Sequence, residues 1–258
     1  MVKAVPDILA QIVEHKKAEL CTRQDDIEAR AAASTSDRRD FSRALKASTP
    51  SLIAEIKKAS PSRGVLAVDF DAPATARAYE RGGAAALSVL TDSKYFQGRL
   101  ADLQAARDAV SIPMLRKDFT IDPYHVREAA AHGADAILLI AAILTDREMR
   151  DFRELAEGYR MDAIVEVHDE DELNAAMASG AGIIGVNNRN LHTFEVSLET
   201  SLHLAEKIPS GVVRIAESGI HSRTDVARLS AAGYQAFLVG EHLMKSPDPA
   251  LALRGLLE

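Results

Sequence analysis

Cysteine is nearly absent from this sequence: Cys21 is the only one, and no histidine or cysteine spacing near it suggests a metal site. A single cysteine cannot form an internal disulfide, which is typical of a protein kept in a reducing compartment. We therefore expect no disulfide framework, no structural metal and a cytoplasmic location.

Long apolar runs are lacking at the amino terminus, where charged and apolar residues alternate over residues 1–20. Such a segment has no continuous apolar core of the kind found in a signal peptide or a membrane span. Excess positive charge is lacking as well, because the net charge is −7. That balance gives no electrostatic footprint for nucleic acid or an anionic membrane, so an anionic ligand would need a local basic pocket.

What the sequence does contain is a repeated alternation of short apolar runs with longer amphipathic segments, beginning at about Ser51. The runs cover residues 52–57, 85–90, 113–117, 136–141, 163–167, 183–187, 212–217 and 236–240. Continuous apolar strands indicate burial on both faces, as in a parallel sheet covered by helices. Eight such units, with no glycine-rich dinucleotide fingerprint after the first, favour an α/β fold closed as a (β/α)8 TIM barrel over an open doubly wound sheet.

The boundaries of the helices carry their own signals. Asp122 can cap the start of one helix, with Pro123 at its first position. We expect helix C-caps at Gly82, Gly133, Gly180 and Gly233. The first 50 residues show helical patterns without a strand signal, so we expect one barrel domain over 1–258 in which 1–50 form an N-terminal helical extension. This extension either covers the floor or edge of the barrel or contributes to the substrate pocket.

Charged and polar residues stand at the ends of several predicted strands. Glu55 and Lys57 lie two residues apart, so their side chains point to the same side of one strand. Because an unpaired buried charge costs on the order of several kcal/mol, these residues either form structural ion pairs or face a ligand. Their number at the carboxyl ends, where barrel enzymes bind substrates, favours a ligand. The candidates are Glu55, Lys57, Lys117, Glu166, Asn187, Arg189, Glu217 and Ser218.

Two glycines follow the last two predicted strands, Gly219 in AESGI and Gly240 in VGEHL. The loops at these places commonly bind phosphate in TIM barrels, and glycine lets backbone N–H groups approach an oxyanion. A short helix beginning near Glu241 would direct its positive end at the phosphate. The loop after the first strand adds Ser60 and Arg63, which suit anion contacts. Ordinary turns are the alternative for both glycines.

Aromatic residues follow two of the predicted strands. Tyr95 and Phe96 come after the second run, and Phe119 follows Lys117. Aromatic side chains usually pack in the core, but at this end of a barrel they could form an apolar slot for an aromatic ring.

At these residues the chain resembles the indole-3-glycerol phosphate synthase family. The segments IAEIKKASPSRG, LRKDF, IVEVH, GVNNRNL, AESGI and LVGEHLM follow one another in the family's order. The resemblance implies a TIM barrel that converts 1-(2-carboxyphenylamino)-1-deoxyribulose 5-phosphate to indole-3-glycerol phosphate, with loss of carbon dioxide and water, in tryptophan biosynthesis. It implies no cofactor and no metal. The expected partner is this phosphorylated small molecule, without nucleic acid or membrane, and we expect a monomer.

Carried over residue by residue, the resemblance implies that Lys117 is the general acid for ring closure and that Glu166 is the complementary acid or base in dehydration. Lys57 would hold the carboxylate or phosphate side of the substrate. Residues implied to orient the substrate and tune the lysines are Glu55, Asn187, Glu217 and Ser218. Residues implied to bind the substrate are Ser60, Phe96, Phe119, Arg189, Leu191, Gly219, Gly240 and Glu241.

Three other functions fit part of this pattern. A phosphoribosylanthranilate isomerase-like enzyme would share the barrel and the phosphate loops but needs a different acid–base pair. An aldolase would use a lysine at a strand end as a nucleophile with a lowered pKa. A non-catalytic phosphometabolite-binding barrel would keep the phosphate site and lack turnover.

Overall fold

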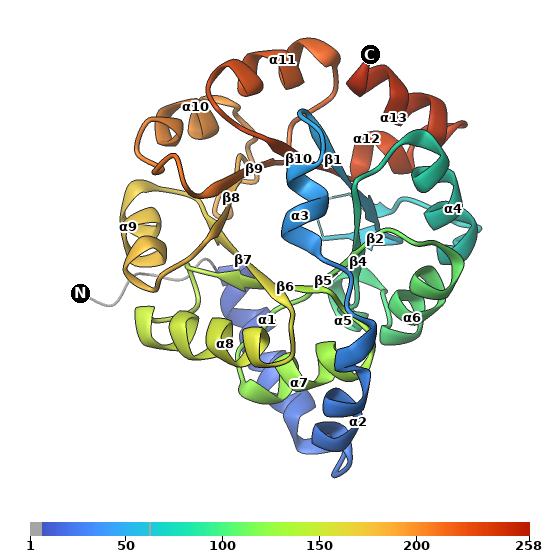
Figure 1. The fold of residues 1–258 in the computed structure, drawn as a ribbon, viewed down its shortest axis with the longest axis vertical. Coiled ribbons are helices and arrows are strands. Elements are labelled where there is room, and N and C mark those ends of the chain that lie inside the picture. The colour runs from blue at the N-terminus through green and yellow to red at the C-terminus, as the bar shows by residue number, and fades with distance from the viewer. Residues whose placement is uncertain (1–6, 62) are drawn as a thin grey trace.

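The computed structural model describes residues 7–61 and 63–258, and its centre is a closed barrel of parallel strands (Figure 1). The barrel strands are β1 (Ser51–Ile56), β4 (Ala86–Leu90), β5 (Met114–Lys117), β6 (Ala136–Ile140), β7 (Asp162–Val167), β8 (Ile183–Asn187), β9 (Val213–Glu217) and β10 (Ala236–Val239). Strand β1 pairs with both β4 and β10, which closes the ring. The predicted TIM barrel is confirmed, and each predicted run matches a barrel strand to within one residue at either end.

A ring of helices surrounds the strands in Figure 1. These helices are α4 (Ala72–Gly82), α6 (Leu100–Ala109), α7 (Pro123–Ala131), α8 (Asp146–Gly158), α9 (Glu170–Ala178), α10 (Glu199–Ala205), α11 (Arg223–Ala231) and α13 (Pro249–Leu257). Smaller elements lie in the loops after strands: β2 (Ala59–Ser60), β3 (Gly64–Val65), α5 (Ser93–Phe96) and α12 (Glu241–Met244). Within the described residues, no helix combines the length and the apolar character needed to cross a membrane.

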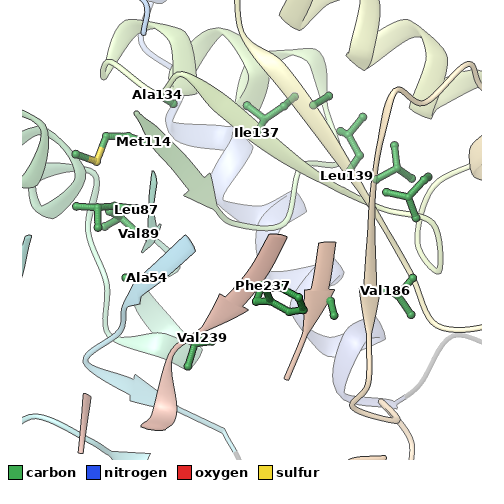
Figure 2. Close-up of a cluster of buried hydrophobic side chains, with 14 of the residues drawn as sticks. Ala54, Leu87, Val89, Met114, Ala134, Ile137, Leu139, Val186, Phe237 and Val239 are labelled. Carbon is green, nitrogen blue, oxygen red and sulfur yellow. The ribbon is translucent and has the colours of Figure 1, made fainter. Parts of the chain in front are cut away.

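Side chains of each barrel strand alternate between two apolar clusters. Ala54 belongs to the larger cluster, which joins the strands to the surrounding helices, whereas Ile53 belongs to a smaller cluster inside the barrel. Figure 2 shows part of the larger cluster, with Ala54 on β1, Leu139 on β6 and Phe237 on β10. Because alternate residues share a face, the inner columns of side chains run on toward the carboxyl ends of the strands, where the predicted charged residues stand.

Helix ends follow the predicted glycines with one exception. Gly133, Gly180 and Gly233 have φ of 83°, 83° and 99° and lie just beyond α7, α9 and α11, as expected. The prediction for Gly82 was wrong, because α4 continues through Gly82 and the left-handed residue is Gly83, with φ of 95°. A Cβ at position 82 would lie 3.0 Å from a carbonyl oxygen of α13, so this glycine permits close helix packing instead.

The amino-terminal extension consists of α1 (Asp7–Glu19), the 3-10 helix η1 (Leu20–Thr22), α2 (Ile27–Ala33), the 3-10 helix η2 (Ser34–Asp37) and α3 (Phe41–Lys46). Both expected roles occur, in different helices. Helix α3 buries Phe41 and Leu45 in the inner cluster, and the Ser42 N–H donates to the Asp162 carboxylate at the start of β7 at 2.8 Å. Helix α1 contributes to the cavity at the opposite end. Figure 1 accordingly shows α3 in front of the barrel opening and α1 behind the strands.

Candidate active site

A cavity of about 450 Å³ opens at the carboxyl ends of the strands. Its size suits a small organic ligand, and its position is that of barrel active sites. The site residues that the family resemblance implies all line it: Glu55, Lys57, Ser60, Phe96, Lys117, Phe119, Glu166, Asn187, Arg189, Leu191, Glu217, Ser218, Gly219, Gly240 and Glu241. Tyr95, also expected at the apolar slot, is not among the lining residues and packs against the inner cluster instead. The inner columns of separate strands therefore bring residues distant in sequence to one place.

Lys117 occupies the centre of the charged groups in this cavity. Its side chain is 12 % exposed, and its Nζ lies 2.7 Å from Glu166 Oε2 and 3.1 Å from Glu217 Oε2. Strands β5, β7 and β9 alternate around the barrel, and side chains from alternate strands share a layer in this fold. Lys117 thus donates to carboxylates on β7 and β9, two strands that do not pair with β5.

The charges of this group set one another's pKa values. Burial alone would lower the pKa of Lys117, but the carboxylates of Glu166, Glu217 and Glu55 together raise it above its ordinary value. Burial would raise the pKa of Glu166, yet the Lys117 ammonium and then His168 hold it down, at about 2. For Glu217, burial outweighs the attraction of Lys117, so its pKa is raised to about 7. The lysine is therefore an ammonium, Glu166 a carboxylate, and Glu217 the group that titrates near neutrality.

Glu217 has further signs of a poised group. Its Oε1 atom is buried and has no hydrogen-bond partner among the described residues. A Cβ at Gly185 would lie 2.3 Å from that atom, so the glycine in β8 makes room for the carboxylate. A buried acceptor without a partner favours the protonated state, which agrees with the raised pKa.

Lys57 and Glu55 form a second ion pair beside the first. Lys57 Nζ lies 2.5 Å from Glu55 Oε2, as the shared strand face predicted. Gly240 does more than shape a turn, because a Cβ there would lie 2.2 Å from the same Glu55 oxygen. No local pattern indicates this close approach between the end of β10 and the Glu55 side chain of β1.

The end of β9 adopts a strained backbone. Ser218 has φ of 67° and Gly219 has φ of 77°, and a non-glycine residue in this region costs about 1–3 kcal/mol. The Ser218 hydroxyl donates to Asn187 Oδ1 at 2.9 Å, and the Arg189 N–H donates to the same oxygen at 3.0 Å. This turn fixes the Asn187 amide beside Glu166, whose pKa it helps to lower.

The predicted phosphate loops lie together on one side of the cavity. Helix α12 begins at Glu241, as expected. The Glu241 carboxylate forms ion pairs with Lys245 at 2.6 Å and with Arg63 at 3.3 Å, so its side chain is already paired with cations. Two residues missed from the sequence, His221 and His242, also line this side, with ring centroids 6.0 Å apart.

Another part of the cavity wall is apolar. Phe96 and Phe119 have ring centroids 6.1 Å apart, and Leu191 packs against the same cluster. Helix α1 adds side chains that the sequence could not assign to the site: Ile8, Leu9 and Ile12. The cavity therefore joins an apolar slot, a buried acid–base group and a loop region suited to an anion.

His168 was also missed from the sequence. Its Nδ1 lies 2.9 Å from Glu172 Oε2 and its Nε2 lies 3.5 Å from Glu166 Oε1. Burial would lower its pKa, but the bond to Glu172 and the Glu166 charge raise it above the ordinary histidine value. Within 7–61 and 63–258, no cluster of histidine, cysteine and carboxylate side chains could hold a metal ion.

Comparison with known proteins identifies the family. The family model described as indole-3-glycerol phosphate synthase matches residues 9–256. A protein from Leptothrix cholodnii with that name is 48 % identical to this chain, covering 97 % of it and 98 % of the relative. A Koribacter versatilis protein of the same name is 54 % identical, covering 80 % of this chain and 79 % of the relative.

Solved structures resemble the chain in fold alone. The thiamine phosphate pyrophosphorylase from Pyrococcus furiosus has a TM-score of 0.61 at 17 % identity and covers 81 % of this chain and 94 % of its own. A mutant tryptophan synthase alpha-subunit from Pyrococcus furiosus has a TM-score of 0.62 at 17 % identity, covering 81 % and 98 %. The function rests instead on the family match and on relatives of nearly equal length, which show that this chain belongs to the indole-3-glycerol phosphate synthase family.

Proposed function

We propose that Lys117, Glu166 and Glu217 carry the proton transfers by which this carboxy-lyase forms indole-3-glycerol phosphate. The observation that carries the proposal is the Lys117 ammonium, which is buried and lies 2.7 Å and 3.1 Å from two carboxylates. Its raised pKa keeps Lys117 protonated, with a proton to give, and opposes the aldolase alternative, in which a Schiff-base lysine needs a lowered pKa.

Ring closure comes first. The substrate's ring carbon that bears the carboxylate attacks the ketone carbon, and the ketone oxygen becomes an alkoxide. Lys117 gives a proton to that oxygen as the charge develops, which lowers the barrier by general-acid and electrostatic stabilisation. Carbon dioxide then leaves, and the electron pair of the broken carbon–carbon bond restores the aromatic ring.

Dehydration needs an acid and a base. Glu217, with a pKa of about 7, supplies a proton to the leaving hydroxyl, and Glu166, a carboxylate, accepts the proton from the neighbouring carbon. Over the whole reaction the carboxylate leaves as carbon dioxide, the hydroxyl leaves as water, and one proton is taken up. A carboxyl group that titrates near neutrality is suited to renewing that proton.

The remaining residues bind and orient the substrate. Ser60 and the backbones of Gly219, Gly240 and Glu241 hold the phosphate, and Lys57 holds the substrate carboxylate or the phosphate side. Phe96, Phe119 and Leu191 contact the aromatic ring. Glu55, Asn187, Arg189 and Ser218 orient the substrate and the lysines. The cavity combines an apolar slot with glycine loops, which suits a substrate with a ring at one end and a phosphate at the other.

Replacing Lys117 tests this proposal. We expect Lys117→Ala to lose turnover on the order of 1,000-fold while the affinity for a phosphorylated substrate analogue changes little. The chain contains no tryptophan, so the indole fluorescence of the product reports turnover directly against a low background. Activity within severalfold of the unaltered protein would remove Lys117 from the role of general acid.

We also propose that residues 1–258 act as one domain and as a monomer in the cytoplasm. Side chains of a single chain surround the whole cavity, and Cys21 is free and exposed, as a reducing compartment allows. Light scattering after size exclusion should give the mass of one chain. A stable dimer at micromolar concentration would contradict the monomer.

A further inference from the structure

Lys16 is a buried lysine outside the charged group of the active site. It lies on α1 and is only 4 % exposed. Its Nζ lies 2.9 Å from Asp118 Oδ1, 2.9 Å from Glu19 Oε2 and 3.3 Å from Asp92 Oδ2. Burying an ammonium costs on the order of several kcal/mol unless it is paired, so these three carboxylates are what permits its position.

Two of its partners belong to the loops that form the cavity wall. Asp118 stands between Lys117 and Phe119 in the chain. Asp92 caps α5, where its Oδ1 accepts the backbone N–H of Phe96 at 3.3 Å. One ammonium therefore contacts both segments that bring Phe96 and Phe119 to the cavity.

Asp118, one of these partners, is held in place by residues of the barrel. Asp118 Oδ2 accepts from Arg116 at 3.0 Å and from the Thr91 hydroxyl at 2.5 Å, while its Oδ1 faces Lys16. The charges of Arg116 and Lys16 hold the pKa of Asp118 far below its usual range, against the effect of burial. Lys16 thus pairs with a carboxylate that Arg116 and Thr91 of the barrel hold in place.

The same face of α1 reaches into the substrate cavity. Ile8, Ile12 and Lys16 are spaced four residues apart, so they lie one above another on the helix. Ile8 and Ile12 line the cavity, and Ile12 is packed in the inner cluster with Phe119. The lysine is the polar end of an apolar face that covers the mouth of the barrel.

We propose that Lys16 is a positioning residue for the reaction, because its ammonium fixes α1 and the Phe96 and Phe119 segments to one another and so forms the wall for the substrate's ring. The inference rests on the proposed substrate site. Lys16 touches neither the acid–base group nor the phosphate loops, and it acts through Ile8, Ile12 and the two aromatic rings. Removing it should weaken substrate binding far more than the chemical steps.

The test compares Lys16→Met with Lys17→Met. Lys17 is the next residue on the same helix, but it is exposed, and among residues 7–61 and 63–258 its ion pair is with Glu14, at 2.7 Å. We expect Lys16→Met to raise KM more than about tenfold while kcat falls less than about threefold, and Lys17→Met to change neither by more than about twofold. Hydrogen exchange should speed up over α1 and stay unchanged in the barrel strands.

A second substitution measures coupling between the lysine and the cavity wall. Ile12→Ala should raise KM in the unaltered protein but add less than about twofold in the Lys16→Met background, where the wall is already open. Additive effects would mean that Lys16 does not act through Ile12. That result would overturn the proposal.

Other outcomes are equally decisive. An unchanged KM in Lys16→Met, or faster exchange throughout the barrel, would reject a positioning role. If Lys16→Met does not fold, Lys16→Gln, which keeps a donor toward Asp118, undergoes the same measurements; failure of both to fold would assign Lys16 to stability alone and overturn the inference. Loss of turnover in Lys117→Ala together with an unaltered Lys16→Met enzyme would reject this inference and leave the proposed acid–base roles intact.

Discussion

The two ends of the barrel use the same inner columns of side chains for opposite purposes. At the amino end, Phe41 and Leu45 of α3 fill the column ends with apolar groups that are fully buried. At the carboxyl end, the columns finish in Lys117, Glu166 and Glu217, which contact one another as charges. Apolar burial stabilises a fold, whereas buried charges contribute little net stability, so the contrast separates a structural end from a chemical one.

The largest effect should follow from Glu166→Gln at the chemical end. The amide keeps the shape of the side chain but cannot accept the proton in dehydration, so we expect turnover to fall on the order of 1,000-fold. Lys117 retains Glu217 as a partner, and the midpoint of urea unfolding should shift little. Product fluorescence and a urea titration measure the two quantities. Turnover within tenfold of the unaltered enzyme would contradict the assignment of Glu166.

Phe41→Ala should produce the reverse result at the structural end. Removing this fully buried ring from the inner cluster should lower the free energy of unfolding by about 3–5 kcal/mol. The protein that remains folded should keep its KM and kcat within about twofold, because none of the residues of α3 lines the cavity. Urea unfolding and product fluorescence on the same sample decide the matter. A large change in kcat with unaltered stability would contradict the assignment of the amino end of the barrel to structure and the carboxyl end to chemistry.

Lys57→Ala tests the ion pair at the edge of the catalytic group. An anion clamp acts both before and during the chemistry, so KM should rise and kcat should fall, with kcat/KM lower by on the order of 100-fold. Lys58→Ala is the matched control, because Lys58 is adjacent in the chain and its side chain is not part of the cavity lining. Unchanged KM in Lys57→Ala, or equal losses in both variants, would count against the clamp.

Glu217 should make stability depend on pH in the direction opposite to a paired carboxylate. Its folded pKa of about 7 exceeds the unfolded value, so the folded state binds the extra proton between about pH 4.5 and 7 and loses stability as the pH rises through this window. Glu166, with a folded pKa of about 2, contributes stability that is lost only as the pH falls toward 2.

Glu217→Gln should therefore be more stable than the unaltered protein at pH 8, by about 3 kcal/mol, and by less than about 1 kcal/mol near pH 5. Urea unfolding at the two pH values provides the measurement. An equal difference at both pH values would show that Glu217 does not titrate in this window.

The barrel could be predicted because each strand is a continuous apolar run, and the charged site because lysine and glutamate are conspicuous at the ends of such runs. The position of α1 at the cavity could not be predicted, because an amphipathic pattern shows only that one face of a helix is buried and not what it packs against. Lys16 and Lys17 are identical in type and adjacent, yet only tertiary contacts with Asp92 and Asp118 separate a buried residue from an exposed one.

Some of the roles of the glycines could be predicted from the sequence and others could not. Gly133 was predictable because a left-handed residue commonly follows a helix. Gly185 and Gly240 make room for the carboxylates of Glu217 and Glu55, which lie on neighbouring strands far away in sequence. A requirement set by another strand leaves no local signal. His168 was missed for a different reason: it lies only two residues from Glu166 in the sequence, but its pairing with Glu166 and Glu172 is visible only in the folded structure.

The most direct test of the chemical end is the protonation state of Lys117 itself. NMR detection of its side-chain nitrogen, assigned by comparison with Lys117→Arg, follows the ammonium as the pH is raised. We predict that Lys117 remains an ammonium beyond pH 10, because Glu166, Glu217 and Glu55 raise its pKa. Deprotonation between pH 6 and 9 would contradict the raised pKa and the permanently charged Lys117 on which this account rests, and borohydride trapping of substrate on Lys117 would assign it the chemistry of a Schiff base instead.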